Sequence, residues 1–354
     1  MKKLLEYYPH HKDYMGMFNE FRPFVTFTNT PLWRSGSVNT DKYGLREQYD
    51  SNGEYIDLDE VSKKYDQCNV IIGGSTVFGT DASSDKHTLS FYLNEVNIPC
   101  ISLGNCGAVS HQELAAFLLY KRKLPKIKNI ILFSGLNNCS LSSIDGSLFY
   151  PEHGAVFFED IMAKELYHQY EGFTASTFIL SKFEYYRAIE KRFKRSALFR
   201  HLIHIFYRNK IKNPPKFVLR SYEEKQEMMN SFLANEFETW SWIQKASGAQ
   251  IHYIIQPVVG WTHKPLAKGE QALIDEYHEH YPAVKQYAND AAFGKYKAFL
   301  RNLCMERNFQ FLDSNEWLNG TEMVSEEIFT DICHLSDRGN EFLASKIREH
   351  INLN

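Results

Sequence analysis

Short apolar runs alternate with amphipathic stretches along the chain from about residue 66. The runs are rich in β-branched residues, which is typical of strands buried on both faces of a sheet. They lie at residues 69–72, 100–103, 129–134, 250–259 and 309–312. Helical periodicity predicts helices at about 85–96, 111–123, 223–246, 283–307 and 336–350. Strands that alternate with helices predict a parallel sheet and an α/β fold.

Two helix starts have sequence signals of their own. Ser110 and Glu113 have the spacing of a capping box, which predicts that a helix begins there. Ser336 precedes the last amphipathic stretch and is expected to be its N-cap.

Two parts of the chain depart from the alternation. Residues 1–65 are rich in aromatic and turn-forming residues and predict an irregular extension packed on the core, with Asn39 and Arg46 as candidates for the mouth of a site. Residues from about 140 to 235 exceed what one crossover needs, so they predict a helical insertion between the third and fourth strands. We expect one elaborated domain at residues 66–354, preceded by the extension.

The middle of the insertion, Ser181–Lys216, is basic. It has eleven Lys and Arg side chains against two Glu, with apolar residues at helical spacing. Three interpretations stay open: a lid over the site, a surface for peripheral contact with anionic lipid or a polyanionic carrier, and a helical hairpin with a solvated basic face.

Composition narrows the class of protein. With 354 residues and 44% hydrophobic content the chain can bury a proper core, and a net charge of −3 does not point to nucleic acid. The six cysteines form no regular framework, and neither an apolar leader segment nor a run of about 18 apolar residues is present. We therefore expect a reduced, cytoplasmic protein, and the sequence says nothing about its oligomeric state.

Candidate chemistry begins where the first strand ends, in the stretch NVIIGGSTVFG at residues 69–79. Gly73 and Gly74 allow a sharp turn, and Ser75 follows at the carboxyl end of the strand, where parallel sheets have their ligand crevices. Ser75 is thus a candidate nucleophile; the alternative is a tight turn whose serine only caps the next helix.

Asp331 and His334 lie three residues apart near the C-terminus. A serine needs a base, and the imidazole needs a carboxylate that orients it and stabilises its charged form. His334 and Asp331 are candidates for these roles. His263 is a rival base without a nearby acid in the sequence.

Two further stretches follow predicted strands and supply donors for an oxyanion. Gly107 in SLGNCGAVS offers a backbone N–H, and Asn137 in IILFSGLNN offers a side-chain amide. Together with the N–H of Ser75, these donors would form an oxyanion hole.

The order GGS, a glycine after the second strand, GxN and then DxxH resembles the SGNH (GDSL-type) hydrolase family. The resemblance covers roughly residues 66–140 and 250–350. It implies a flavodoxin-like, three-layer α/β/α sandwich with a central five-stranded parallel sheet. It also implies acyl chemistry with Ser75 as nucleophile, His334 and Asp331 as base and acid, and Ser75, Gly107 and Asn137 as the oxyanion hole.

Two positions depart from the family pattern. Gly74 stands where the first block commonly has aspartate, and Asn138 stands where the third block commonly has aspartate. Neither belongs to the triad or the oxyanion hole, so these changes bear on substrate preference and activity.

The interpretation is a serine-dependent ester hydrolase acting on O-acyl esters, with short acetyl esters of saccharides as the first expectation. Alternatives are an acyltransferase that uses the same triad, and a catalytically silent binding protein. Thr76, Asn138 and Trp261 are candidate substrate contacts. No cofactor is expected, and no metal, because Cys106, Cys139 and Cys333 around His334 lack zinc-ligand spacing.

Overall fold

The computed structural model describes residues 2–17, 19–22, 26–142, 221–320, 323 and 326–354. Most of the predicted insertion, including Ser181–Lys216, lies outside these residues, so its lid, membrane and hairpin interpretations remain untested predictions.

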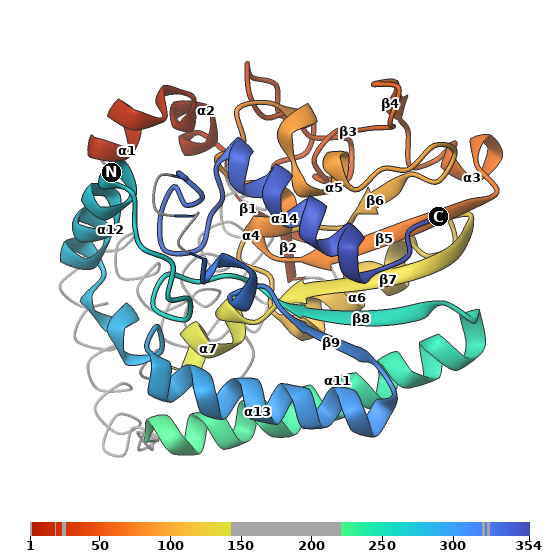
Figure 1. The fold of residues 1–354 in the computed structure, drawn as a ribbon. Coiled ribbons are helices and arrows are strands. Elements are labelled where there is room, and N and C mark those ends of the chain that lie inside the picture. Colours follow the sequence, from red (N-terminus) through yellow and green to blue (C-terminus); the bar gives the residue numbers. More distant parts are fainter. Residues whose placement is uncertain (1, 18, 23–25, 143–220, 321–322, 324–325) are drawn as a thin grey trace, which may run out of the picture.

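A five-stranded parallel sheet forms the centre of the molecule, in the spatial order β6-β5-β7-β8-β9 (Figure 1). The strands are β5 (Gln67–Gly73), β6 (Cys100–Ser102), β7 (Lys126–Ser134), β8 (Gln250–Ile255) and β9 (Gln310–Asp313). Counted along the chain, these strands have the order 2-1-3-4-5, which is that of doubly wound, flavodoxin-like folds. The predicted fold class and all five predicted strands are confirmed.

Helices cover both faces of the sheet. One face packs against α6 (Ser110–Tyr120), α11 (Tyr222–Ser247) and α13 (Asp290–Arg307), with Trp240 and Leu300 fully buried. The other face packs against α5 (Leu89–Tyr92) and α14 (Asp337–His350), the two helices above the sheet in Figure 1. Neighbouring strand residues alternate between the faces, as Ile71 and Ile72 do, which explains why the strands are apolar throughout.

The structure describes further helices besides those of the two layers. They are α1 (Lys2–Tyr7), η1 (Pro9–His11), α2 (Lys12–Met15), α3 (Val61–Lys64), α4 (Ser75–Phe78), η2 (Asp85–His87), α7 (Leu136–Ser142), α12 (Lys268–His280), η3 (Pro282–Gln286) and η4 (Glu316–Leu318). Two small antiparallel pairs precede the main sheet, β1 (Asn19–Arg22) with β2 (Thr26–Asn29) and β3 (Gln48–Tyr49) with β4 (Tyr55–Ile56).

Three of the predicted helices differ in detail. The helix expected at 85–96 is two short pieces, η2 and α5, because Thr88 leaves the helical backbone and caps α5. The helix expected at 283–307 is divided into η3 and α13, since extended Asn289 caps α13. Helix α6 begins at Ser110 as predicted, but the predicted capping box of Ser110 and Glu113 was wrong, because Ser110 is already helical and the Gln112 side chain accepts the N–H of Val109. Helix α12 was not predicted, whereas Ser336 caps α14 as expected.

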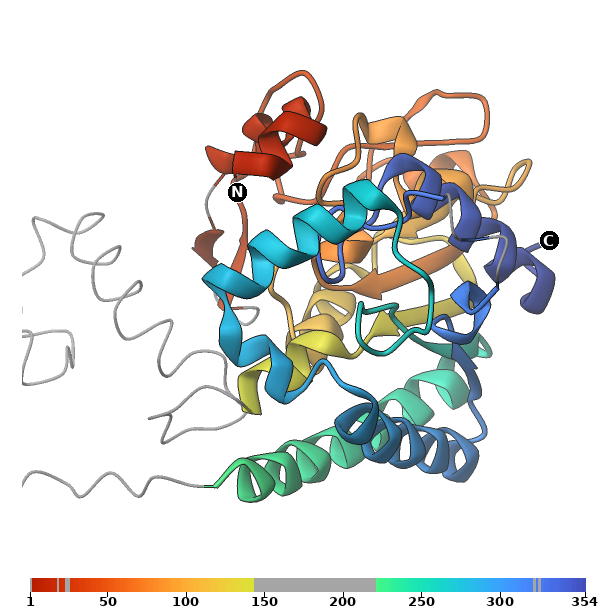
Figure 2. The same cartoon turned by 60° about the vertical axis from the view of Figure 1, so that its left-hand side comes forward.

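The N-terminal segment, defined here as residues 2–17, begins with α1, which packs against α12 (Figure 2). The backbone N–H groups of Lys2 and Lys3 donate to the carboxylate of Glu276. Arg46 is buried and donates to Asp85, and Asn39 donates to the same carboxylate. Arg46 is thus part of the core and not of the mouth of the site, whereas Asn39 is half-buried and its expected place there stays a prediction.

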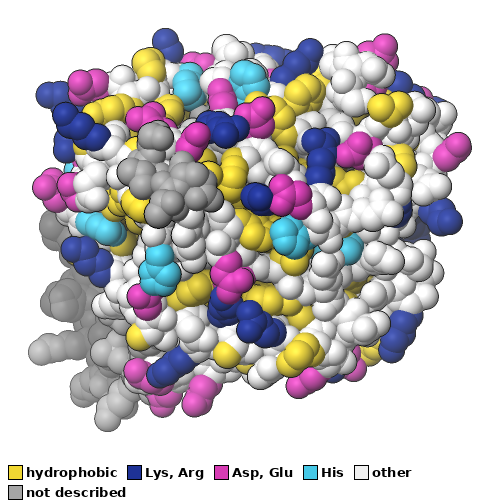
Figure 3. All heavy atoms as spheres, in the orientation of Figure 1, with side chains coloured by type: hydrophobic (Ala, Val, Ile, Leu, Met, Phe, Trp, Pro, Cys, Tyr) yellow, Lys and Arg dark blue, Asp and Glu magenta, His cyan; other side chains and the backbone are white. Residues whose placement is uncertain are grey.

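The surface is mixed in charge. On the face drawn in Figure 3, acidic and basic side chains are interspersed, as a net charge near zero leads one to expect. In the described part of the chain no helix has both the length and the apolar character needed to cross a membrane.

Candidate active site

Ser75 is the first residue of α4, directly after β5. The turn between them requires glycine, because a Cβ at Gly73 would lie 2.2 Å from the carbonyl oxygen of Phe133. Gly79 ends α4 after one turn in a left-handed conformation, with φ of 81°. The glycines around Ser75 therefore deliver it at the end of a central strand, as the sequence predicted.

Three side chains from opposite ends of the chain are in hydrogen-bond contact there. Ser75 Oγ lies 2.7 Å from His334 Nε2, and His334 Nδ1 lies 2.6 Å from Asp331 Oδ2. The second carboxylate oxygen of Asp331 accepts the backbone N–H groups of Cys333 and His334, each at 2.8 Å. The acid is thus oriented by its own loop, and the structure brings the three predicted residues together.

The pKa values of the pair reflect this contact. Burial raises the pKa of Asp331, but the charge and hydrogen bond of His334, with the two backbone N–H groups, outweigh it and lower the pKa to about 2. Burial lowers the pKa of His334, but the attraction and hydrogen bond of Asp331, with the charge of Asp81, outweigh it and raise the pKa to about 9. The carboxylate therefore stays ionised and stabilises a protonated imidazole.

The three residues predicted to form the oxyanion hole each retain an N–H group without an acceptor in the described part of the chain. Neither the backbone N–H of Ser75 nor that of Gly107 has an acceptor among residues the structure describes. Asn137, on α7, donates one amide N–H to the carbonyl of Ala108 at 2.7 Å, which leaves its second N–H. A Cβ at Gly74 would lie 2.5 Å from Asn137 Nδ2, so this amide sits against the turn that carries Ser75.

The three expected substrate contacts are buried parts of the framework. Thr76 accepts from Gln256 Nε2 at 3.1 Å and is 3% exposed. Asn138 Oδ1 accepts the N–H of Ser110 at 3.1 Å. Trp261 is 2% exposed, stacks on Phe293 and donates its ring N–H to the carbonyl of Tyr287. These assignments were wrong, because helix and strand packing turns all three side chains inward.

The rival base and the cysteines fall outside this arrangement. His263 is exposed, and among the residues that the structure describes only its backbone N–H has a hydrogen-bond partner, Asn319. Burial raises the pKa of the Cys106 thiol to about 11 and that of Cys139 still further. Neither thiol is therefore an activated nucleophile.

One group of possible metal donors was found in the described ranges, formed by Asp331, Cys333 and His334. Both oxygens of Asp331 and both ring nitrogens of His334 already make hydrogen bonds. Burial and the charge of Asp331 raise the pKa of Cys333 well above its usual range, whereas zinc binds the thiolate. The chemistry of this donor set does not fit a zinc site.

Two supporting residues escaped the sequence interpretation. Gln256 follows β8 and contacts both Thr76 of α4 and, through Oε1, the N–H of Leu136 of α7 at 3.4 Å. Asp81 follows α4 and accepts the hydroxyl of Thr330, next to Asp331. Neither belongs to a motif, and only their positions just beyond a strand end and the serine turn could have drawn attention to them.

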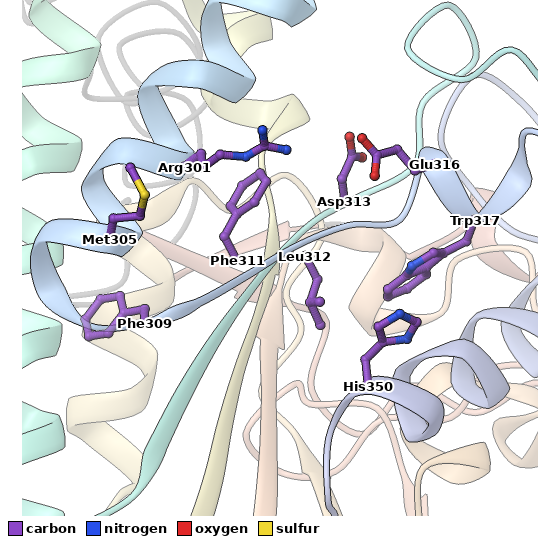
Figure 4. Close-up of a pocket in the computed structure, with 9 residues that line it drawn as sticks. All are labelled: Arg301, Met305, Phe309, Phe311, Leu312, Asp313, Glu316, Trp317 and His350. Carbon is purple, nitrogen blue, oxygen red and sulfur yellow. The ribbon is translucent and has the colours of Figure 1, made fainter.

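A separate groove of about 380 Å³ lies along the edge strand β9 (Figure 4). Its lining comes from β9, α13, η4 and the end of α14, and includes Arg301, Trp317 and His350. None of its lining residues belongs to the Ser75 site.

Comparison with known proteins adds distant structural likenesses. No protein-family model matches the chain, and no curated protein matches it. Among solved structures, it is similar to an acetyl xylan esterase at 12% identity and a TM-score of 0.37, covering 80% of this chain and 99% of the other. It is also similar to a candidate acylhydrolase from Bacteroides fragilis at 12% identity and a TM-score of 0.40, covering 86% and 89%. At this level of likeness, function has to be argued from the chemistry of the site.

Proposed function

We propose that this protein is a serine-dependent hydrolase of carboxylic O-acyl esters, with Ser75 as nucleophile. The observation that carries the proposal is the unbroken hydrogen-bonded line from Ser75 Oγ through His334 to Asp331, at 2.7 and 2.6 Å. A serine hydroxyl is activated when it is hydrogen-bonded to Nε2 of an imidazole whose Nδ1 is hydrogen-bonded to a carboxylate.

The reaction would run in two halves. Ser75 Oγ attacks the acyl carbon while His334 Nε2 takes its proton, and His334 then gives that proton to the departing alkoxide. Water attacks the resulting acyl-serine with His334 again as base, which releases the acid and restores Ser75. Asp331 keeps the proton on Nδ1 and stabilises the imidazolium that forms in each half.

Negative charge would develop on the former carbonyl oxygen in both halves. The N–H groups of Ser75 and Gly107 lack acceptors in the described part of the chain, and Asn137 retains one amide N–H. Donors that are already unpaired need little reorganisation when an oxyanion forms, which is why such holes contribute strongly to acyl transfer.

Covalent labelling with a fluorophosphonate probe tests this proposal without knowledge of the substrate. We expect the native protein to be labelled at Ser75, Ser75→Ala to be inert, and His334→Ala to react about 10³-fold or more slowly. Peptide mapping would locate the adduct.

The chain offers a matched control in Ser83, whose hydroxyl lies 2.8 Å from His87 Nδ1 but is 2.5 Å from Asp337 Oδ2. A hydroxyl beside a carboxylate is not activated in the same way, so Ser83→Ala should be labelled like the native protein. Absence of labelling in well-folded native protein would contradict the proposal and favour a binding protein. If Ser75 is labelled, a panel of acetyl and longer esters, with and without a sugar acceptor, would separate hydrolysis from acyl transfer.

A further inference from the structure

Asp81 is a buried carboxylate just beyond the serine helix. It lies two residues after Gly79, the C-cap of α4, and is 1% exposed. Its φ of 69° places it in the left-handed region, which aspartate enters more readily than most non-glycine residues.

The contacts of Asp81 come from both ends of the chain. Its Oδ2 accepts the hydroxyl of Thr330 at 2.8 Å, and its Oδ1 lies 2.5 Å from Nδ1 of His11. The backbone carbonyl of Asp81 lies 2.8 Å from Nε2 of His10. One residue therefore joins the segment after Ser75, the loop before Asp331 and the N-terminal segment.

Thr330 links Asp81 to the candidate base. The backbone N–H of Thr330 donates to the carbonyl oxygen of His334 at 3.0 Å, which closes the loop that contains Asp331 and His334. A displacement of Thr330 would therefore move His334 relative to Ser75. Asp81 itself follows α4, the helix that begins with Ser75.

The N-terminal segment is anchored around this point. The hydroxyl of Tyr14 donates to the carbonyl of Ala82 at 2.6 Å, and Asp13 accepts the N–H and the hydroxyl of Ser37. A hollow of about 410 Å³ lies at the seam, lined by Tyr8, His10, Asp81, Glu327, Ser336, Asp337 and Arg338. The His11 side chain is 14% exposed and its partner Asp81 1%, so their contact is largely screened from solvent.

Asp81 also acts on the base through its charge, since it contributes to the raised pKa of His334. The titratable groups around Asp81 are Tyr8, His10, His11 and Tyr14 of the N-terminal segment, Cys106 after β6, Cys333 and His334 of the loop, and Glu327, Asp337 and Arg338, which line the same hollow. His11 is the one among them that is in direct contact with its carboxylate.

We infer that Asp81, held by His11, is a positioning residue for the Ser75 site, and that the N-terminal segment completes the site through this histidine–carboxylate pair. The inference rests on the proposed function. Asp81 would hold the loop with Asp331 and His334 in place against the helix that begins with Ser75, and would favour the protonated form of His334.

The test combines the NMR titration of His334 with the pH dependence of fluorophosphonate labelling. Asp81→Asn keeps the size of the side chain, and asparagine tolerates the left-handed backbone, so mainly the charge is lost. We expect the pKa of His334 to fall. Labelling needs the neutral imidazole of His334, so the acid limb of its pH profile should move to lower pH. The maximal labelling rate should drop by up to about 10²-fold, because the loop is less well held.

Variants of His11 separate positioning from general stability. His11→Gln retains an N–H that can donate to Asp81 and should keep a near-native maximal rate, whereas His11→Phe should lower it. Asp13→Asn loosens the same segment without touching Asp81 and should leave the His334 pKa and the acid limb unchanged.

An unchanged pKa of His334 together with an unchanged acid limb in folded Asp81→Asn would overturn the inference, as would equal rates for the two His11 variants. If Asp81→Asn does not fold, the comparison of His11→Gln with His11→Phe still tests the inference. Native protein that is not labelled at all would refute the proposed function, and the NMR titration would then still show whether Asp81 acts on His334.

Discussion

Gly74 shows how one residue can shape the site without taking part in chemistry. It stands where the SGNH pattern commonly has aspartate, and it is here the residue that leaves room for the Asn137 amide. Its φ of −82° is not left-handed, so it is the limited space beside it that favours glycine at this position. The departure is therefore a packing feature of the proposed oxyanion hole.

We predict that Gly74→Ala leaves the fold intact but slows labelling at Ser75 by about 10²- to 10³-fold, the usual cost of losing an oxyanion donor. The added Cβ would meet Asn137 Nδ2 at 2.5 Å, and the end of a side chain can move away where a backbone atom cannot. Labelling rates and melting temperatures measure the two effects.

Gly294→Ala is the matched control, because Gly294 lies within α13 with nothing within 4 Å of its added Cβ. It should keep the native labelling rate and be slightly more stable. Native labelling of Gly74→Ala would show that Asn137 is not a donor to the oxyanion.

At the scale of elements, helix α6 brings a carboxyl group into the core. Glu113 is buried and accepts the hydroxyl of Ser134, the last residue of β7, at 2.7 Å. Burial raises the pKa of Glu113 to about 8, and that of Glu236 on α11 to about 7. At neutral pH, Glu113 is thus largely protonated in the folded protein and ionised in the unfolded chain.

This difference predicts a stability that falls as pH rises from about 4.5 to 8, because over that range the folded state binds more protons than the unfolded state. Glu113→Gln removes the titration. We expect it to increase the free energy of unfolding by about 1–3 kcal/mol at pH 8 relative to the native protein, with a much smaller difference at pH 5.

Urea unfolding at the two pH values measures this difference. Glu306, whose side chain is 60% exposed, supplies the control, and Glu306→Gln should show no such pH dependence. An equal effect of Glu113→Gln at both pH values would mean that Glu113 is ionised in the folded state.

At the scale of the whole molecule, Glu270 of α12 forms a buried ion pair and also contacts the residues before the loop of the candidate base. Lys264 Nζ lies 2.5 Å from Glu270 Oε2, and both side chains are fully buried. The other oxygen of Glu270 accepts the backbone N–H groups of Ile328 and Phe329, just before Asp331. Since α1 packs on α12 (Figure 2), helix α12 contacts both the N-terminal segment and the residues just before Asp331.

We predict that Glu270→Ala lowers the free energy of unfolding by about 3–5 kcal/mol, because it leaves the Lys264 charge buried without its partner. Labelling at Ser75 should also slow at temperatures where the variant is still folded. Glu279→Ala on the exposed side of the same helix is the control and should change neither. A loss of stability with native labelling would show that Glu270 supports the fold but not the loop.

Local patterns were enough to predict the sheet and to select Ser75, His334 and Asp331, which are hydrogen-bonded in the structure. Buried strands are apolar over four or more consecutive residues, and the glycines and polar residues that follow them are local in sequence. For this reason Ser75, Gly107, Asn137, Asp331 and His334 could be selected one stretch at a time. Helix α12 was missed because only two of its large apolar residues, Leu273 and Ile274, are buried.

Only the tertiary structure decided which polar and aromatic side chains near the strand ends face the core. Thr76, Asn138 and Trp261 follow the same local pattern as the site residues, but packing from other elements buries them. The contacts of Asp81 with His11 and Thr330 span 70 and 249 residues, and no local signal encodes such a separation. The sequence determined the strands and the reactive groups at their ends, because these depend on neighbours along the chain. The folded structure decided orientation and support, because these depend on neighbours in space.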